Sequence, residues 1–340
     1  MKICVCGGGN LGHAAAGFIA AREKDEVRIL TRHPERWSAN VTVWRPDGDM
    51  PVVGRLAKVS DRPDEVVADA DVVLLCLPGF SIREVLLSIR DYLSPECAVG
   101  SVVCSTGFFF EAMQLLPATT PLFGFQRVPF IARTVEYGHL VQITGYKPSL
   151  SMAVEQTYRK EELRQLSERM FNTPTCLLDS YYEVSLSNSN PLLHPARLYD
   201  LWNDWREGMV YPSVPLFYEE WTERAAQLYI DMDGELQQLL HELHVKGIPS
   251  VFDYYESSDA SSLARKLRSI TAFKGILAPM KAVEGGYQPD VESRYFTEDF
   301  PYGLAIARRL AHEKGIHTPT MDRVYEWGTQ LIKPQPSWIQ

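Results

Sequence analysis

The chain has 340 residues, of which 45% are hydrophobic, and its formal net charge is −9 at neutral pH. A chain of this length is expected to form two domains with full cores. The negative charge gives no reason to expect nucleic acid or an anionic membrane as a partner, and no apolar stretch approaches the length of a membrane span.

The first segment has the pattern of a dinucleotide-binding βαβ unit. Residues 2–6 (KICVC) predict a strand, residues 7–12 (GGGNLG) form a GxGxxG turn, an Ala-rich helix follows, and residues 26–31 (EVRILT) predict a second strand. Glycines in such a turn allow a tight bend, close approach of the backbone to a pyrophosphate, and close contact between helix and strand. The helix N-terminus offers free N–H groups to the phosphates. The expected cofactor-binding residues of this turn are Gly7, Gly9, Asn10, Leu11 and Gly12.

The end of the second strand bears on which dinucleotide binds. An NAD site usually places Asp or Glu about 20 residues after the glycines, where it binds the ribose 2′-OH. Here the corresponding position is Arg32, which follows Thr31, and Arg36 lies four residues further along. Because a guanidinium matches a 2′-phosphate in charge and geometry, we expect all three residues near the adenosine ribose, with NADP(H) preferred over NAD(H). A solvated surface arginine is the alternative interpretation.

The alternation of strands and helices continues through the first half. Residues 69–77 and 97–104 are apolar and strand-like, and residues 81–93 predict an amphipathic helix capped by Ser81. Fully apolar strands alternating with helices favour an α/β fold with a Rossmann-type, doubly wound parallel sheet. Ligands bind beyond the C-terminal strand ends in such sheets, although turn chemistry alone explains the same residue types. The expected lining residues there are Leu77, Pro78, Gly79, Phe80, Ser105, Thr106 and Gly107.

The six cysteines indicate neither a metal site nor disulfides. None forms a CxxC pair, and most lie in or beside apolar, strand-like runs. Buried thiols in a reducing compartment fit this distribution. The glycine turn at residue 7 also leaves no room for a signal peptide, so we expect a cytoplasmic protein without a metal.

From about residue 181 the pattern becomes helical. Strand-like runs stop, and residues 221–243 place apolar side chains at helical spacing. We therefore expect a dinucleotide-binding Rossmann domain over residues 1–180. Residues 181–340 are expected to form a mostly α-helical domain that carries the substrate and catalytic residues.

Two segments of the helical half have side chains suited to catalysis. In residues 188–196 (NSNPLLHPA), two prolines four apart are expected to interrupt a helix, which places His194 at a helix start or break rather than on a packed face. Residues 294–303 (RYFTEDFPYG) precede a helix whose dipole favours acidic residues at its start. A structural histidine, and helix capping by Glu298 and Asp299, are the alternative interpretations.

Together these features resemble the octopine/nopaline (opine) dehydrogenase family. The resemblance covers both domains in order: a Rossmann domain, then N-x-N-P-x-x-H-P-A, then R-Y-x-x-E-D-x-P-x-G. It implies that His194, paired with Asp299, is the acid/base, and that Arg294 holds a substrate carboxylate. Asn190, in the first motif, is a second substrate-binding candidate. One feature departs from the family, because several members use NAD with an acidic residue where Arg32 stands here.

The resemblance implies an NAD(P)H-dependent oxidoreductase that joins a 2-oxo acid to an amino acid or amine and reduces the imine with hydride. Neutral imidazole takes a proton from the incoming ammonium and returns one to the departing oxygen near pH 7. A carboxylate on its other nitrogen fixes the tautomer, and a guanidinium suits the oxo acid carboxylate. The site is expected in a cleft between the domains, and the sequence is compatible with a homodimer.

Two other interpretations stay open. Ketopantoate reductase-like and glycerol-3-phosphate dehydrogenase-like enzymes also join a Rossmann domain to helices, and they typically rely on a lysine, for which Lys274 and Lys281 are candidates. A non-catalytic NADP(H)-sensing protein would need the glycine turn but not the pair of His194 and Asp299. Aromatic candidates for a substrate pocket, which core packing explains as well, are Tyr199, Trp202, Tyr211 and Tyr254.

Overall fold

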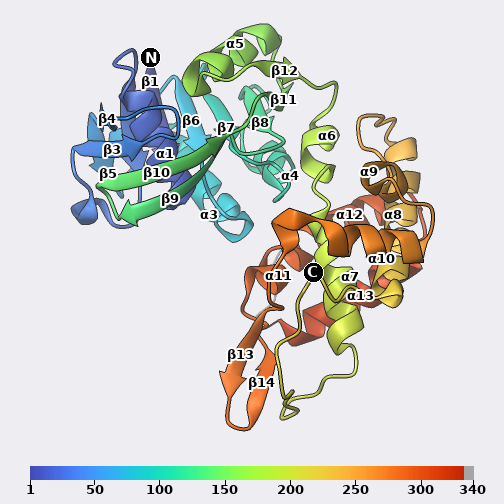
Figure 1. The fold of residues 1–340 in the computed structure, drawn as a ribbon. Helices are drawn as coiled ribbons and strands as arrows, with labels where there is room; N and C mark the ends of the chain where they lie inside the picture. The colour runs from blue at the N-terminus through green and yellow to red at the C-terminus, as the bar shows by residue number, and fades with distance from the viewer. Residues whose placement is uncertain (333–340) are drawn as a thin grey trace. The chain divides into compact units, whose positions relative to one another are not determined.

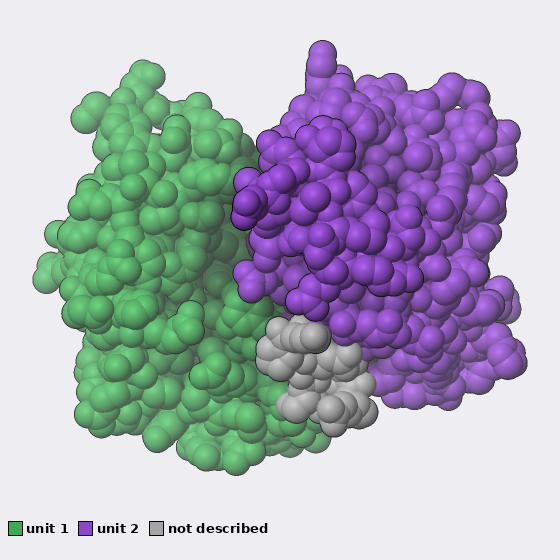
Figure 2. Space-filling model, turned by 90° about the horizontal axis from the view of Figure 1, so that it is seen from below, with its two compact units in different colours: residues 1–187 green, residues 188–340 purple. Residues whose placement is uncertain are grey.

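The computed structural model describes residues 1–332 (Figure 1). The chain divides into two compact units, Met1–Ser187 and Asn188–Gln340, which Figure 2 colours green and purple. The sequence pattern changes at about residue 180, but the first unit continues for seven residues beyond that point. The short helix α6 (Tyr181–Leu186) contacts strand β11 (Leu150–Glu155), which is why it belongs to the first unit.

The first unit is built on an eight-stranded sheet with the order β12-β11-β8-β7-β6-β1-β2-β5. All neighbouring strands are parallel except β8 and β11, which are antiparallel. This confirms the predicted Rossmann-type sheet. The bounds are β1 (Lys2–Cys6), β2 (Glu26–Leu30), β5 (Lys58–Ser60), β6 (Val72–Leu75), β7 (Ala98–Ser101), β8 (Leu122–Phe125), β11 (Leu150–Glu155) and β12 (Thr175–Leu177).

Both faces of this sheet are covered by helices, so its central strands β1, β6, β7 and β8 are buried on both sides. In β1, Ile3 and Val5 enter one hydrophobic core, whereas Cys4 and Cys6 enter the other. The first core contains residues of α1 (Asn10–Ala20) and α5 (Lys160–Phe171). The second core contains residues of α2 (Pro63–Val66), α3 (Gly79–Ile89), α4 (Phe108–Leu115) and α6.

The start of α3 corrects the prediction of a serine cap. The helix begins at Gly79 with Pro78 in the N-cap position, and no side chain caps it. Ser81 lies in the first turn, and its backbone N–H donates to the Pro78 carbonyl at 3.0 Å. The proline, with φ −70° and ψ 159°, already turns the chain from strand to helix, so the helix starts before the serine.

A second, four-stranded sheet lies against α1 and was absent from the sequence predictions. Its order is β4 (Val52–Arg55), β3 (Asn40–Trp44), β10 (Leu140–Tyr146) and β9 (Phe130–Glu136). A Cβ on Gly17 of α1 would lie 2.6 Å from Val43 Cγ2, so only glycine allows this close packing. The sheet thus holds β9 and β10 beside the helix that follows the glycine turn.

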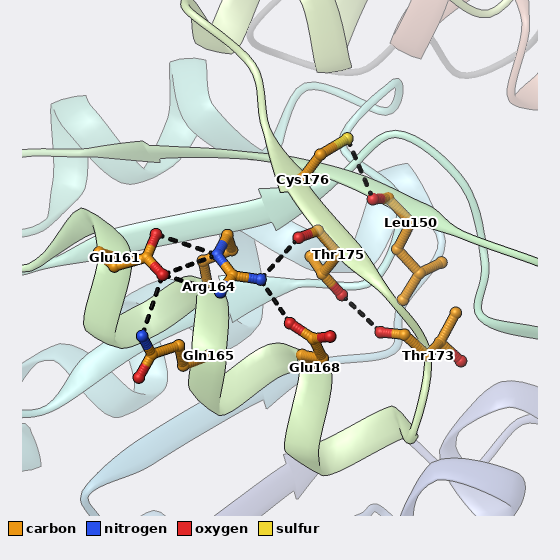
Figure 3. A network of polar contacts seen from close by, with 8 residues as sticks. All are labelled: Leu150, Glu161, Arg164, Gln165, Glu168, Thr173, Thr175 and Cys176. Atoms are coloured by element: carbon orange, nitrogen blue, oxygen red, sulfur yellow. Dashed lines mark hydrogen bonds and ion pairs between the residues drawn. The ribbon is translucent and has the colours of Figure 1, made fainter.

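The edge strand β12 is fastened to α5 by one arginine (Figure 3). Arg164 forms an ion pair with Glu161 at 2.7 Å and another with Glu168, and it donates to the Thr175 carbonyl at 2.8 Å. The neighbouring Cys176 thiol donates to the Leu150 carbonyl at 3.4 Å. These contacts anchor the last strand before the chain leaves the sheet.

The second unit is mostly helical, as predicted, and its one β-hairpin within residues 188–332 joins β13 (Met280–Val283) to β14 (Gly286–Pro289). The helix predicted over residues 221–243 is α8 (Glu223–Glu242), capped by the hydroxyl of Thr222, which accepts from Ala225 N–H at 3.0 Å. The other helices are α7 (Asn190–Trp202), α9 (Val251–Tyr255), α10 (Ala260–Ser269), α11 (Arg294–Thr297), α12 (Ala305–Glu313) and α13 (Pro319–Leu331), with a π-helical turn η4 (Phe300–Leu304) before α12.

The sequence also predicts buried cysteine thiols and no membrane-spanning segment. All the cysteines are free; five are buried, but Cys176 is exposed, which corrects the expectation of buried thiols at that position. Cys176 lies on the edge strand β12, where one side of the strand has no neighbour in the sheet. Within residues 1–332, every helix is too short or too polar to cross a membrane.

Candidate active site

The glycine turn after β1 is tight, and its backbone packs closely against the neighbouring segments. Gly7 has φ +125°, and a Cβ there would lie 2.5 Å from the Cys76 carbonyl oxygen. A Cβ on Gly12 would collide with the Gly7 carbonyl, so these two glycines allow the tight turn and the close contact of helix with strand. At Gly9, by contrast, a Cβ would meet no described atom within 4 Å. Packing within residues 1–332 therefore does not explain why Gly9 is glycine.

The N-terminus of α1 follows this turn. Gly9 is its N-cap residue, and no side chain in the described part of the chain caps the helix. The side chain of Asn10 accepts from the backbone N–H of Thr134 at 2.9 Å, which fastens β9 to the helix start. Leu11 packs against the core. Within residues 1–332, no carboxylate or hydroxyl thus competes for the first N–H groups of the helix.

The residues after β2 lie beside the glycine turn because Tyr137 connects the two segments. The Tyr137 hydroxyl is 3.5 Å from Thr31 Oγ1, and a Cβ on Gly8 would lie 2.5 Å from that hydroxyl. The guanidinium of Arg36 lies over the Tyr137 ring, 4.3 Å from its centroid. Arg32 is exposed and has no hydrogen bond or ion pair with any residue from 1 to 332. Tyr137 lies in no motif, so the sequence did not predict its place beside the glycine turn.

The other residues expected near the cofactor follow β6 and β7. A Cβ on Gly7 would lie 3.1 Å from Leu77 Cδ2, so Leu77 lies directly against the glycine turn, and Pro78 comes next. The buried Thr106 hydroxyl finds no hydrogen-bond partner among the residues that the structure describes. Strands β2, β1, β6 and β7 are parallel neighbours, so the segments following them share one edge of the sheet.

In the second unit, His194 and Asp299 are hydrogen-bonded although 105 residues separate them in sequence. His194 Nδ1 lies 2.8 Å from Asp299 Oδ2, and the two side chains are only 10% and 16% exposed. Asp299 stands at the N-cap position of η4 but forms no capping hydrogen bond, because its carboxylate is directed to His194. Helix capping therefore does not account for this aspartate.

The helix that carries His194 differs from the expected one. Pro191 lies in the first turn of α7, where a missing N–H costs nothing, but Pro195 lies inside the helix, which continues to Trp202. The predicted interruption between the two prolines is thus wrong. His194 is buried within the helix and packs against the rings of Phe217 and Tyr295, with ring centroids 5.6 and 4.4 Å away.

The second nitrogen of His194 is also engaged. Its Nε2 lies 2.8 Å from the hydroxyl of Tyr218, which is buried. Burial raises the pKa of Tyr218 and that of Tyr295. Tyr295 belongs to the second motif and was therefore within reach of sequence reasoning, but Tyr218 lies in an unremarked stretch, PLFYEEW. Trp202, one of the suggested pocket residues, is instead buried against Phe296.

The candidate substrate-binding residues begin two helices of this unit. Arg294 is the first residue of α11; it is exposed, and within residues 1–332 its side chain has no hydrogen bond or ion pair. Its neighbour Tyr295 contacts the His194 ring, so Arg294 starts the segment that packs on the histidine. Asn190 is the first residue of α7, where its N–H donates to Asn188 Oδ1 at 3.3 Å. Lys274 and Lys281 are exposed.

Each half of the chain matches a known protein family. Residues 177–332 match the family described as NAD/NADP octopine/nopaline dehydrogenase, alpha-helical domain, and residues 2–103 match the family described as NADP oxidoreductase coenzyme F420-dependent. Octopine dehydrogenase of Pecten maximus is 27% identical over 98% of this chain and 90% of its own length. Two solved octopine dehydrogenase structures, one with NADH and L-arginine and one with NADH and pyruvate, are 26% identical. Each has a TM-score of 0.86, covering 97% and 98% of this chain and 89% of theirs.

Proposed function

The chain belongs to the opine dehydrogenase family of NAD(P)H oxidoreductases, and on that premise we propose that it condenses a 2-oxo acid with an amino acid or amine and reduces the imine. The observation that carries the proposal is the hydrogen bond between His194 and Asp299, 2.8 Å long and nearly enclosed in the helical unit. The arginine and pyruvate complexes of octopine dehydrogenase support these substrate classes.

His194 and Asp299 are proposed to manage the protons of the condensation. A carboxylate only accepts hydrogen bonds, so the neutral imidazole carries its hydrogen on Nδ1 and keeps a lone pair on Nε2. Nε2 is then the base that takes up a proton as the substrate ammonium loses one, which frees the amine to attack the oxo carbon. Asp299 stabilises the resulting imidazolium, which later returns the proton to the departing oxygen as water.

Arg294 is proposed to bind the carboxylate of the 2-oxo acid. Its guanidinium is exposed and has no acidic partner among residues 1–332, so a substrate carboxylate displaces no ion pair of the protein. Guanidinium and carboxylate match in planar, two-point geometry, which fixes the orientation of the oxo acid as well as its charge. Asn190, at the start of α7, is a second candidate for contact with substrate.

The first unit fits a dinucleotide cofactor, which supplies the hydride for the reduction when bound. Gly9 leaves open space at the helix start, Gly7 and Gly12 shape the turn, and α1 has no side-chain cap within the described residues. We propose that Arg32 and Arg36 face the 2′-phosphate of NADP(H), because neither guanidinium forms an ion pair within residues 1–332. NADP(H) is then preferred over NAD(H).

A screen of NADPH oxidation tests this proposal. Pyruvate and other 2-oxo acids are paired with amino acids and amines, and activity is expected only when both partners are present. His194→Ala and Asp299→Asn are expected to lower kcat by roughly a hundredfold or more, the usual scale of general acid–base catalysis, with NADPH affinity nearly unchanged. His317→Ala, on an exposed histidine of the same unit, serves as the control.

The same screen separates the rival functions. Oxidation of NADPH by an oxo acid alone, unaffected by His194→Ala and abolished by Lys274→Ala or Lys281→Ala, would assign the chain to the lysine-dependent reductases. Tight NADPH binding without turnover for any pair of substrates would favour the sensing protein.

A further inference from the structure

The hydroxyl of Tyr218 is hydrogen-bonded to the second nitrogen of the His194 ring. Nδ1 is 2.8 Å from Asp299 Oδ2, and Nε2 is 2.8 Å from Tyr218 Oη. Because the hydrogen on Nδ1 is directed to the carboxylate, the lone pair on Nε2 accepts from the phenolic O–H. Each imidazole nitrogen has one hydrogen-bonding direction in the ring plane, so neither is free to meet a substrate directly.

The ring of Tyr218 is held in place on several sides. It stacks on Phe273 with centroids 4.0 Å apart and an angle of 16°, and it lies nearly parallel to Trp221 at 6.0 Å. Phe217 contacts it edge-on at 4.9 Å, and only 5% of the residue is exposed. Swinging the phenol away from Nε2 would break these aromatic contacts together with the hydrogen bond. The hydroxyl therefore stays on the histidine while the reaction proceeds.

We propose that Tyr218 is a further catalytic residue, which carries protons between the amine substrate and His194. The inference rests on the proposed function, because it assigns to the Tyr218 phenol the contact with substrate through which His194 exchanges protons. The free lone pairs of Tyr218 Oη accept the substrate proton, while the phenolic hydrogen passes to Nε2. Substrate, Tyr218, His194 and Asp299 then form one chain of hydrogen bonds.

The step balances without any further reactant. The N–H bond of the substrate ammonium breaks and leaves its electron pair on the nitrogen, and the released proton forms a new O–H bond on Tyr218. The original O–H bond breaks in the same event, and its proton binds the lone pair of His194 Nε2. Tyr218 ends neutral, and the positive charge resides on an imidazolium beside Asp299. The reverse transfer delivers a proton to the oxygen that leaves as water.

The surroundings favour this concerted transfer over a tyrosinate. Burial raises the pKa of Tyr218, and the charge of Asp299 and the neighbouring phenols of Tyr295 and Tyr255 act in the same direction. A separate anion on Tyr218 would be costly in this setting, whereas a relay never leaves a net charge on the phenol. The titratable groups facing His194 itself are Asp299 at Nδ1, Tyr218 at Nε2, and Tyr295 against the ring.

Tyr218→Phe tests the inference, because it removes the hydroxyl and keeps the stacked ring. With the substrate pair identified by the NADPH screen, kcat is expected to fall roughly a hundredfold, with little change in NADPH affinity. The nitrogen resonance of His194 Nε2, followed by NMR in the full-length protein without substrate, is expected to shift, because that nitrogen loses its hydrogen-bond partner while Nδ1 keeps its bond to Asp299. Tyr325→Phe is the matched control: its hydroxyl is also buried but has no hydrogen-bond partner among residues 1–332.

The outcomes separate this inference from the proposed function. A Tyr218→Phe enzyme within about threefold of the wild-type kcat, while His194→Ala is inactive, would overturn the relay and leave the proposed function standing. A loss of kcat with an unchanged Nε2 resonance of His194 would also overturn it, since a packing defect alone would then explain the loss. Full activity in His194→Ala would instead overturn the proposed function.

Discussion

At the scale of single residues, motifs in the sequence predict some residues of the candidate site, and contacts in the structure identify others. Two motifs contain His194, Asp299 and Arg294, so the sequence predicts these residues without any knowledge of the distances between them. Tyr218 and Tyr137 lie in no motif, and each reaches its partner only through the fold: Tyr218 is 24 residues from His194, and Tyr137 is 106 residues from Thr31. Such contacts depend on the turns and packing of whole elements, which one sequence does not display.

A buried histidine in the first unit links stability to pH. The Nε2 of His13 accepts from the Gly138 N–H at 2.6 Å, its Nδ1–H donates to the Gly9 carbonyl at 2.9 Å, and its ring stacks on Trp37. Burial lowers the pKa of His13. The unfolded chain therefore binds a proton more readily, so the stability present above the unfolded value of about 6.5 is lost as the pH falls toward the folded pKa.

Urea unfolding at about pH 7.5 and about pH 5.5 measures this contribution, which linkage limits to at most about 1.4 kcal/mol for the uptake of one proton. In His13→Gln, the loss of unfolding free energy at the lower pH is expected to be smaller than in the wild type. His317→Gln, on an exposed histidine, should keep the wild-type pH dependence. An equal loss in His13→Gln and wild type would contradict a proton-linked role for His13.

At the scale of elements, apolar runs were the reliable signal. Strands β1, β6 and β7 lie within predicted strands because they are buried on both faces, which leaves a nearly continuous apolar run in the sequence. Strand β2 also lies within a predicted strand, although Glu26 and Arg28 interrupt its apolar residues. The sequence did not predict the second sheet because exposed apolar residues, Ile131 and Val135, obscure the alternation in β9. In addition, β3 pairs in parallel with β10, about 100 residues away. The predicted helix break at Pro195 is wrong because tertiary packing of α7 overrides the local preference of proline to end a helix.

Gly9→Ala tests whether the turn before α1 is built for a ligand. Gly9 has φ −86°, which alanine adopts freely, and the added methyl meets no described atom within 4 Å. The unfolding free energy should therefore change by less than about 1 kcal/mol. NADPH affinity, measured by fluorescence titration, should fall at least about tenfold, because the methyl occupies the space that the pyrophosphate needs.

Gly234→Ala is the matched control for this substitution. Gly234 lies inside α8, and a Cβ there also meets no described atom. It is expected to raise stability by about 1 kcal/mol and to leave NADPH affinity unchanged. Wild-type NADPH affinity in Gly9→Ala would count against a cofactor at this turn.

Arg32→Asp tests the cofactor preference assigned to the loop after β2. The change replaces attraction of the 2′-phosphate by repulsion, so NADPH affinity should fall about tenfold or more while NADH affinity is kept or improved. Arg55→Asp, on exposed strand β4, controls for the change in net charge. Equal affinities of the wild type for both cofactors, or an equal effect of Arg32→Asp on both, would refute the assignment.

At the scale of the whole molecule, the two units divide the residues of the proposed function between them. The first unit carries the glycine turn and the two arginines, and the second carries His194, Asp299, Arg294 and Tyr218. The order of the units and the helical character of the second followed from the sequence, because composition and periodicity change near residue 180. The division at 187/188 did not, because α6 is helical in pattern but packs on the sheet of the first unit.

The fate of the hydride shows whether this protein reduces an imine formed from two substrates. NADPH carrying deuterium at the transferable position is supplied with the 2-oxo acid and amine found in the screen, and the product is examined by mass spectrometry and NMR. We expect a secondary amine that joins both substrates, with deuterium on the former oxo carbon, and loss of this product in His194→Ala. Deuterium in a free 2-hydroxy acid, with the amine left unreacted, would contradict it.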